Sequence, residues 1–469
     1  MKPGRIHIGR LFLASALAML CAGLALGVIA SQAYLFPGFL KDRVSFAALR
    51  PMHVTAVIYW ILMGATGAVY SSLEKLTGKR PGKLAFLQWL LWVTAGAGIF
   101  ICYLRGQFGG REYWEFPPAW ALPLAAAWMI FIVNFIRMSA SIRRWPVYMW
   151  MWMTGTTFFL FTFAENYLWI FPYFRENFVA DMTIQWKVNG SLVGCWNQLI
   201  YGTAFFLMDR IKRSAGTGFS RLAFAMYFLG LFNLMFNWGH HIYTLPTEAF
   251  VRYVGYGVSM TEWIIFARIV YLWRSTVTDV ERHEHNLTFR FLVAADIWVF
   301  INLTQALFMS IPALNRYTHG THVTVAHAMG TTIGINTMIL FAACFEFFRG
   351  GPCDVRRPGR QINVLFWTAQ FSLLVFWISL TAAGVVRGFW QMGDRSLPFN
   401  LMMEQLRPAF VLFAASGAML MISLGGLALI LLRRYVNCDW KEKNTPNISQ
   451  IKKHEPTYRT TVKSIGEPA

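Results

Sequence analysis

Residues 11–30 read LFLASALAMLCAGLALGVIA, an uninterrupted apolar run that follows the basic residues Lys2, Arg5 and Arg10. A run of about 20 apolar residues can cross the hydrocarbon core of a bilayer as a helix. This run is longer than the roughly 7–15 residues of a signal-peptide core, and many similar runs follow it. We therefore predict that it is a retained first membrane span.

The composition of the whole chain supports a membrane protein. Of 469 residues, 56% are hydrophobic and 14% are charged, against about 25% charged in an average soluble domain. The formal charge of +20 lies in short clusters between apolar runs rather than on one face or arm, which argues against a nucleic-acid partner. The cysteines form no CxxC pair, so a disulfide framework, a zinc site and a covalently attached haem are not expected.

Apolar runs of spanning length recur along most of the chain. We predict an all-α integral membrane protein, in which residues 1–434 form a single bundle of twelve transmembrane helices and residues 435–469 form a basic, mobile tail. The predicted spans are 11–30, 47–73, 84–104, 118–136, 146–170, 183–208, 222–241, 250–273, 289–311, 321–348, 362–386 and 404–432. No clear internal repeat is visible, which argues against a transporter built from inverted halves.

The positions of Lys and Arg predict the orientation of the bundle. Cytoplasmic loops carry an excess of these residues, and with the N-terminus inside, most basic residues fall on inner segments. Examples are Lys75, Lys79, Arg137, Arg210 and the Lys-rich tail. Both termini are therefore predicted to be cytoplasmic.

Six of the ten histidines fall in or beside the outer part of predicted spans. They are His53, His240, His241, His319, His322 and His327. Any one of them could be a hydrogen-bonded contact between helices, but ionisable groups within spans are functional candidates by default. Six imidazoles at one depth point to metal binding, because neutral imidazole is a common ligand of transition metals.

The spacing of the histidines refines this prediction. His327 and Met329 are two positions apart, so on an α-helix their side chains point about 200° apart. His240 and His241 point about 100° apart and can both reach one ion. With His53 entering from the second span, this pattern suggests two haems on either side of the tenth span and a non-haem metal near one of them.

Several motifs in this chain resemble a known family, the catalytic subunit of bacterial nitric oxide reductase within the haem-copper oxidase superfamily. The resembling stretches are GREYWEFPP at 110–118, MWMTGTTFFLFTFAENYLW at 151–169, FRENFVADMTIQWK at 174–187, GHH at 239–241, YTHGTHVTVAH at 317–327 and FWISLTAAGVV at 376–386. The resemblance runs along most of the chain in the same order. It implies the twelve-helix bundle of haem-copper oxidase subunit I.

The resemblance also implies roles for individual residues. His53 resembles an axial ligand of a low-spin haem b, and His327 resembles the proximal ligand of the high-spin haem b. His240 and His241 resemble two ligands of a non-haem iron, and Glu262 matches a glutamate near that centre.

The outer GREYWE loop carries a further implied site. Glu112 resembles a residue that helps to hold a calcium ion between haem propionates, with Glu115 nearby. The alternative is that Glu112 and Glu115 are two solvated loop charges.

Three positions depart from the family pattern. Where the family has a third iron-binding His followed four residues later by Glu, this chain has Asn189 and Val193, which share one helical face. Asn189 could offer its amide oxygen as a weaker, harder ligand, or could form a hydrogen bond between helices. Met329 replaces the second His of the low-spin haem. It could ligate the iron and raise the reduction potential, or fill space in the bundle.

We expect the chain to reduce NO to N2O as a nitric oxide reductase-like enzyme of the bacterial inner membrane, with its haem sites toward the periplasm. The alternative is that the chain dismutates NO into N2 and O2, as relatives of this family are proposed to do. That reaction needs no net electrons or protons. A haem protein that binds NO without turnover is a third possibility.

Dioxygen reduction is disfavoured, because NGSLVGCWN at 189–197 lacks the cross-linked His-Tyr signature of the oxidases. With no CxxCH motif, the resemblance implies a membrane-anchored c-type cytochrome as partner.

Overall fold

The computed structural model describes residues 7–260, 262–348, 359–393 and 397–444, and the side chains of residues 262–266 and 437–444 lie outside this description. The prediction of an all-helical protein is confirmed, because no β-strand occurs among the described residues. The longer helices are α1 (Ile8–Ser31), α2 (Phe46–Thr77), α3 (Lys83–Leu104), α4 (Ala121–Ser139), α5 (Val147–Glu165), α7 (Phe178–Ile211), α8 (Arg221–Phe236), α10 (Glu262–Thr276), α12 (Asn286–Ser310), α16 (Arg360–Met392) and α18 (Arg407–Asn444). The shorter ones are α6 (Pro172–Arg175), α9 (Ala249–Ser259), α11 (Asp279–Glu284), α13 (Pro312–Thr318), α14 (His322–Met329), α15 (Met338–Phe347) and α17 (Phe399–Gln405).

Nine helical segments within the described ranges are long and apolar enough to cross a membrane. They are Ile8–Tyr34, Phe46–Thr77, Lys83–Leu104, Pro118–Ser139, Arg221–Ile242, Asn286–Ser310, His322–Phe347, Arg360–Met392 and Arg407–Val436. The predicted number of twelve is therefore not confirmed. The other three predicted spans correspond to α5, which is rich in Thr and Trp, to α7, which carries Asp181 and Lys187, and to the separate helices α9 and α10.

The predicted tail begins inside the last helix. Helix α18 continues past residue 434 as far as Asn444, so the first ten residues of the predicted tail are helical. Residues 445–469 lie outside the described residues.

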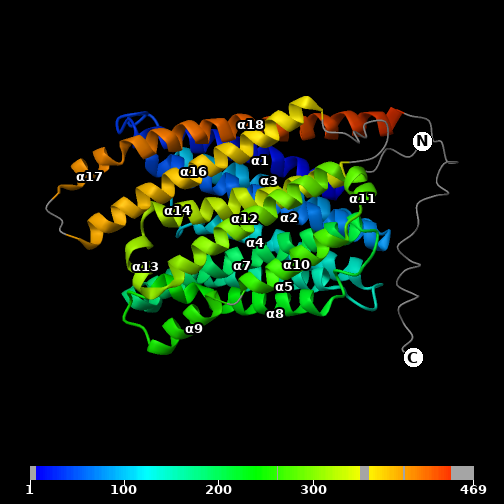
Figure 1. Cartoon of the computed structure of the whole chain (residues 1–469), viewed down its shortest axis with the longest axis horizontal. Helices are drawn as coiled ribbons and strands as arrows, with labels where there is room; N and C mark the ends of the chain where they lie inside the picture. The colour runs from blue at the N-terminus through cyan, green and yellow to red at the C-terminus, as the bar shows by residue number, and fades with distance from the viewer. Residues whose placement is uncertain (1–6, 261, 349–358, 394–396, 445–469) are drawn as a thin grey trace.

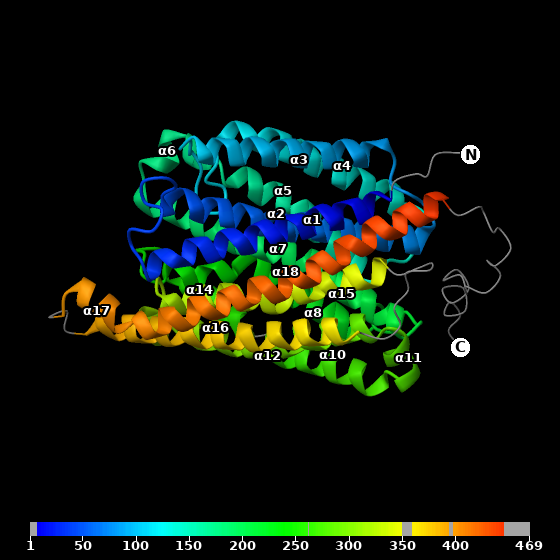
Figure 2. The same ribbon diagram turned by 90° about the horizontal axis from the view of Figure 1, so that it is seen from above.

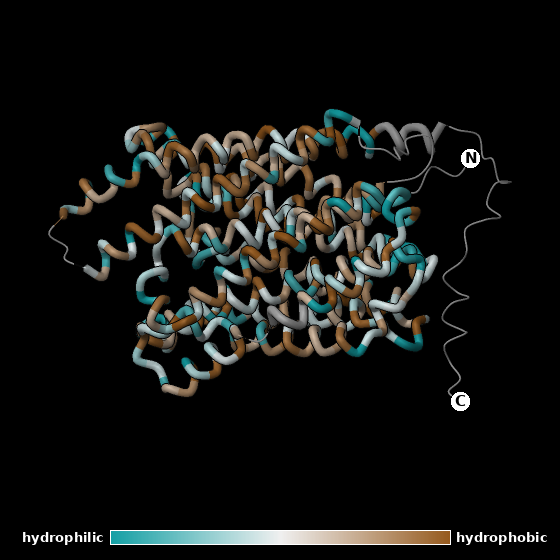
Figure 3. Tube along the Cα trace, in the orientation of Figure 1, coloured by the Kyte–Doolittle hydropathy of each residue, from teal (hydrophilic) through white to brown (hydrophobic). Residues whose placement is uncertain are grey.

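The long helices lie side by side in one bundle (Figure 1, Figure 2). Helices α9, α13 and α17 lie at one end of this bundle, and α11 lies at the other. Hydrophobic residues dominate along the helices, whereas hydrophilic residues gather around α11 (Figure 3). We call the end with α9 and α13 the histidine end, and the end with α11 the opposite end.

Helix α2 forms the core of the bundle. Every residue from 58 to 73 in this helix is buried, as expected for a helix that is covered on all sides. Its close contact with α1 requires small residues, because a Cβ atom at Gly67 would lie 2.7 Å from the carbonyl oxygen of Gly9. This small-residue packing is common between membrane helices.

Helix α2 runs parallel to the segment that contains α14 and α15. Trp60 Nε1 donates a hydrogen bond to Thr337 Oγ1 at 2.9 Å, and a Cβ atom at Gly64 would meet Leu340 at 3.0 Å. His53 precedes Trp60 by seven positions and Met329 precedes Thr337 by eight. Counted back from the bond between Trp60 and Thr337, His53 and Met329 therefore lie at similar levels on neighbouring helices.

The segment between α14 and α15 is a π-helix, η5, over Gly330–Thr337. A side chain shows the same spacing of five residues. Thr337 Oγ1 donates a hydrogen bond to the carbonyl oxygen of Thr332, five positions earlier, at 2.7 Å. π-Helical turns are rare and often lie at functional sites. This one directly follows the candidate ligands His327 and Met329.

A buried ionic cluster ties three helices together at the opposite end. Glu346 on α15 accepts hydrogen bonds from Arg210 Nε on α7 at 2.6 Å and from Thr288 Oγ1 on α12 at 3.1 Å. His285 Nδ1 lies 2.9 Å from the second oxygen of Glu346. The side chain of Glu346 is only 2% exposed, so its charge is compensated inside the bundle.

Candidate functional site

His53 is oriented by the backbone of α1. Its Nδ1 lies 2.7 Å from the carbonyl oxygen of Gly23, and a carbonyl can only accept, so Nδ1 carries the proton. This tautomer leaves the Nε2 lone pair available for a metal. Gly27 allows the ring to approach α1, because a Cβ atom at this position would lie 2.8 Å from His53 Cε1. The arrangement suits the predicted role of His53 as a haem ligand.

His240 and His241 lie on a 3₁₀-helix, η4 (Asn237–Ile242), that follows α8. Their ring centroids are 4.2 Å apart. The α-helical separation of about 100° that the sequence suggested is wrong, because a 3₁₀-helix has three residues per turn and separates neighbours by about 120°. The two imidazoles nevertheless stay close enough to share one ion.

A hydrogen-bond chain fixes the tautomer of His240. Ser259 Oγ lies 2.6 Å from Asn237 Oδ1 and 2.7 Å from the carbonyl oxygen of Gly255, both acceptors of its proton. The oxygen of Ser259 is then the acceptor for His240 Nδ1, which lies 3.2 Å away. As at His53, Nε2 of His240 keeps its lone pair, and Ser259 orients the ring from behind.

Two residues without an assigned role in the sequence surround His241. The indole of Trp186 on α7 stacks on the His241 ring at 4.8 Å, and His319 lies 5.9 Å from the same ring. Burial lowers the pKa of His319, which favours a neutral imidazole there. His319 belongs to the set of outer histidines that the sequence singled out, whereas no local pattern marks Trp186.

Asn189 adjoins Gly190, the residue through which α7 packs against η4. A Cβ atom at its neighbour Gly190 would come within 2.8 Å of Trp238 Cβ, so the two backbones are close. Asn189 is 5% exposed, and its Oδ1 is buried without a hydrogen-bond partner in the described part of the chain. Val193, one turn further on, is half-buried and packs against the apolar core.

His327 lies in the same neighbourhood as the histidine pair. His327, like His240 and His319, is near enough to His241 for a charge on its ring to affect that of His241. The Nδ1 atoms of His241 and His327 are both buried without a partner among the described residues. Met329 is half-buried and packs against the apolar core at the level of His53.

The two acidic residues of the outer loop are bound by one arginine. Arg50 on α2 donates to Glu112 Oε1 at 2.6 Å and to Glu115 Oε1 at 2.7 Å. Burial raises the pKa of Glu115, although Arg50 opposes this shift. Glu115 Oε2 remains buried and without a partner among the described atoms. Glu112 and Glu115 therefore act as a paired structural unit of the loop rather than as two separate solvated charges.

Of the two remaining sequence candidates, only His322 can be placed, and it does not join the cluster. Glu262 is the first residue of α10, and its side chain lies outside the described residues. The ring of His322 lies 5.9 Å from that of Tyr34 and 5.1 Å from that of Phe410, so it packs against α18 and the end of α1. Among the described side chains, no group of three or more His, Cys, Asp or Glu converges on a metal position.

The donor set nevertheless fits the implied cofactors. The unpartnered atoms at this end include imidazole nitrogens of His241, His319 and His327 and an amide oxygen of Asn189. Imidazole binds haem iron and non-haem iron, and an amide oxygen is a hard ligand for the same metals. The open donors at the histidine end are therefore of the types that haem iron and a non-haem metal require.

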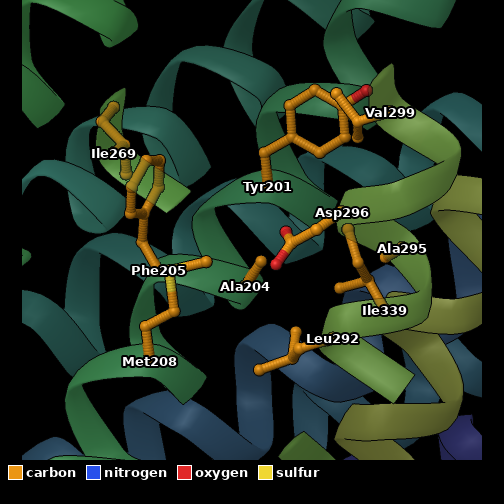
Figure 4. A pocket seen from close by; sticks show the side chains of 10 residues that line it. All are labelled: Tyr201, Ala204, Phe205, Met208, Ile269, Leu292, Ala295, Asp296, Val299 and Ile339. Atoms are coloured by element: carbon orange, nitrogen blue, oxygen red, sulfur yellow. The ribbon is translucent and has the colours of Figure 1, made fainter. Parts of the chain in front are cut away.

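Away from the histidines, Asp296 on α12 lies in a small apolar cavity (Figure 4). Its carboxylate points into a space lined by α7 residues such as Tyr201 and Phe205 and by Ile339. Asp296 is 5% exposed, and its Oδ2 has no hydrogen-bond partner among the described residues. Sequence reasoning missed this group, although a single Asp in the apolar run 289–311 is itself a signal.

Comparison with known proteins places this geometry in a family. The chain is 25% identical over 440 residues to a nitric oxide reductase subunit of Stutzerimonas stutzeri, covering 85% of this chain and 88% of that protein. It is 22% identical over 438 residues to a bacteroid cytochrome c oxidase subunit 1 homolog of Bradyrhizobium diazoefficiens, covering 86% and 77% of the two chains.

The fold and the family model agree with these relatives. A solved haem-copper terminal oxidase dimer has a chain with a TM-score of 0.68 to this one at 13% identity, covering 95% of this chain and 85% of that chain. The family model for cytochrome c and quinol oxidase polypeptide I matches residues 7–427. The protein is thus a multi-pass membrane protein that belongs to the cytochrome c and quinol oxidase polypeptide I family, the haem-binding oxidoreductase subunit I of the haem-copper oxidases.

Proposed function

We propose that this chain is the catalytic subunit of a nitric oxide reductase, which converts two NO, two electrons and two protons into N2O and water. The observation that carries the proposal is the ring contact between His240 and His241, with His327 in electrostatic reach of His241 and with buried, unpartnered Nδ1 atoms on His241 and His327. The similarity to the nitric oxide reductase subunit of Stutzerimonas stutzeri over most of both chains supports the same activity.

The proposed cofactors are two haems b and a non-haem iron. His53 and Met329 would hold the low-spin haem, and His327 the high-spin haem. His240, His241 and the amide oxygen of Asn189 would hold the non-haem iron. When bound, these groups supply the redox chemistry and bind NO.

The protein contributes orientation and proton handling. Gly23 and Ser259 fix the tautomers of His53 and His240 through their Nδ1 atoms, and Trp186 fixes the plane of His241. Glu262 is the proposed acidic residue near the centre. Val193 has a hydrocarbon side chain and cannot carry a proton. Protons are therefore proposed to reach the centre by a route that avoids the face of α7 with Asn189 and Val193.

Dismutation of NO into N2 and O2 is the second candidate. It needs no net electrons and no net protons, so Val193 beside Asn189 would not impair it. Met329 also favours it, because His/Met ligation would raise the reduction potential of the low-spin haem and disfavour electron delivery. Val193 and Met329 both belong to the proposed centre or lie next to it.

The proposed partner is a membrane-anchored c-type cytochrome at the histidine end, and this end is proposed to face the periplasm of a bacterial inner membrane. Exposed aromatic side chains lie there, including Tyr173 at 82% and Phe178 at 68% exposure. They are close in sequence to Asp181, which Arg111 of the outer loop binds at 2.8 Å.

A calcium ion is proposed at the second carboxylate oxygens of Glu112 and Glu115, since carboxylates are its preferred ligands.

The deciding experiment measures anaerobic NO consumption by the purified, haem-replete protein with its electron donor. N2O that forms only with a reductant supports the reductase. O2 that forms from NO without a reductant would replace the reductase with the dismutase. A spectral shift on adding NO without any consumption would contradict both and indicate a binding protein.

A further inference from the structure

A groove on the outside of the bundle runs between α12 and α16 near the opposite end. It has a volume of about 420 Å³, and its lining includes Arg274, the last-turn arginine of α10. Its walls are apolar and aromatic, with Ile297 and Trp367 exposed by 51% and 66%. Such a surface requires a cover, and in a membrane-spanning region the surroundings are lipid.

The two walls of the groove are held in a fixed parallel register. Arg290 on α12 donates to Asn363 Oδ1 on α16, and Trp298 Nε1 donates to Gln370 Oε1 at 3.0 Å. The two bonds join residues 73 and 72 positions apart, so α12 and α16 keep nearly the same offset along the groove. The groove is therefore a preformed feature of the fold rather than a gap between mobile helices.

The two charged groups of the groove gather at one end. Arg274, Asn286 and Arg290 line this end, and no Asp or Glu is among the described residues that line the groove. Asn286 Oδ1 is buried without a partner among the described atoms, and Arg290 is oriented by Phe366, with its Cζ 5.5 Å from the ring centroid. Arg274 also interacts electrostatically with Asp296, which lies in the separate cavity. Two cations beside an apolar channel match a ligand with an anionic head and a hydrocarbon tail.

The length of the groove also fits such a ligand. From Arg290 to Ile301, the α12 wall extends over twelve residues, or about 16 Å along the helix axis. This is long enough for a large part of one acyl chain inside a leaflet about 15 Å thick. Basic pockets between transmembrane helices commonly bind acidic lipid head groups.

We propose that the groove between α12 and α16 binds one molecule of an acidic glycerophospholipid, with its phosphate at Arg274 and Arg290 and an acyl chain along Ile297 and Ile301. The site is distinct from the redox centre at the histidine end, and its occupancy does not depend on which NO chemistry the chain performs. The bound lipid belongs to the leaflet at the opposite end of the bundle.

The test is native mass spectrometry of the full-length protein released from nanodiscs that contain phosphatidylglycerol or phosphatidylcholine. Wild-type protein is expected to retain one phosphatidylglycerol in preference to phosphatidylcholine. Arg274→Gln and Arg290→Gln should each weaken this retention about fivefold. Arg137→Gln is the matched control, because Arg137 is an exposed arginine in the last turn of α4, outside the groove.

A second variant tests the acyl-chain part of the site without touching the arginines. Val293→Trp places a large ring in the groove and should expel the lipid, while the haem spectrum reports that the protein remains folded. Equal retention of both lipids by wild-type protein, or unchanged retention in Arg274→Gln and Val293→Trp, would overturn the proposal. A cross-linker placed at position 297 tests the occupant directly. Capture of a protein segment there instead of lipid would also overturn the proposal.

Discussion

The indole of Trp186 and the imidazole of His241 stack with their planes inclined by only 9° and their centroids 4.8 Å apart. Trp186 precedes Asn189 by three positions on α7, so the two side chains share a helical face. One face of α7 therefore carries both the ring that orients His241 and the amide proposed to complete the iron site.

The stack predicts that Trp186→Leu loses non-haem iron. Without the indole, the His241 ring is free to rotate, and loss of an orienting neighbour typically lowers metal affinity by about 10–100-fold. The measurement is iron per haem in purified protein during titration with a chelator. Trp150→Leu is the control, because Trp150 is 44% exposed and distant from η4 in the fold. Unchanged iron affinity in Trp186→Leu would show that the stack is only packing.

Gly27→Ala is expected to disturb the low-spin haem. The added Cβ atom would lie 2.8 Å from His53 Cε1 and 2.9 Å from Nδ1, closer than these atoms can approach, so the ring must move. We expect most of the low-spin haem signal to be lost in visible and electron paramagnetic resonance spectra. Gly425→Ala, in α18, has no heavy atom within 4 Å of the new Cβ and should retain the signal. Equal spectra for both variants would remove His53 from the haem site.

Met329 can be tested by two substitutions with different expected effects. If its thioether ligates the low-spin haem, Met329→His lowers the reduction potential of that haem, because His/His ligation favours the oxidised state relative to His/Met. Met329→Leu leaves one axial position without a protein ligand and should convert the haem to high spin. A redox titration with spin-state spectra distinguishes these outcomes. If neither variant changes potential or spin state, Met329 only fills space.

Two buried aspartates should respond in opposite ways to the same substitution. Asp296 Oδ2 has no hydrogen-bond partner among the described residues, so Asp296→Leu removes an unsatisfied polar group and should raise the free energy of unfolding by about 1–3 kcal/mol. Asp209 accepts hydrogen bonds from the backbone N–H groups of Thr217 and Gly218 at 2.9 Å. Asp209→Leu should therefore lower stability by a similar amount.

Thermal unfolding of both variants in one detergent measures this contrast. The melting temperature is expected to rise for Asp296→Leu and to fall for Asp209→Leu. A fall for Asp296→Leu would mean that its carboxyl has a polar partner in the membrane, such as an ordered water. Turnover measured alongside would show whether the stabilised variant has lost activity, as often happens when a costly buried polar group serves function.

The fold was largely predictable because the hydropathy of a membrane span can be judged from that stretch of sequence alone. A continuous apolar run such as 11–30 must be covered by lipid or protein, so its helix could be predicted without tertiary information. The run 250–273 was predicted as one span, yet α9 ends at Ser259 and α10 begins at Glu262. Average hydropathy conceals such a break because it does not detect where one helix ends and the next begins.

The site was predictable in its residue types and less so in its contacts. His240 and His241 are neighbours in the sequence, so their proximity followed directly, although the 3₁₀ geometry of NWGHH has no clear local signal. The contact between Trp186 and His241 joins distant parts of the chain. So does the binding of Glu112 and Glu115 by Arg50. Such pairings depend on how helices pack, which one sequence alone does not specify.

The π-helical segment Gly330–Thr337 separates two parts of one span that serve different purposes. Upstream, His327 and Met329 present side chains to the proposed haems, and downstream every residue of α15 is buried in the core. Deleting one residue from the segment would rotate His327 about the helix axis relative to α15 while leaving the core side chains in their places. Insertions and deletions in this segment are thus a means by which descendants of such a chain could re-aim their ligands without rebuilding the bundle.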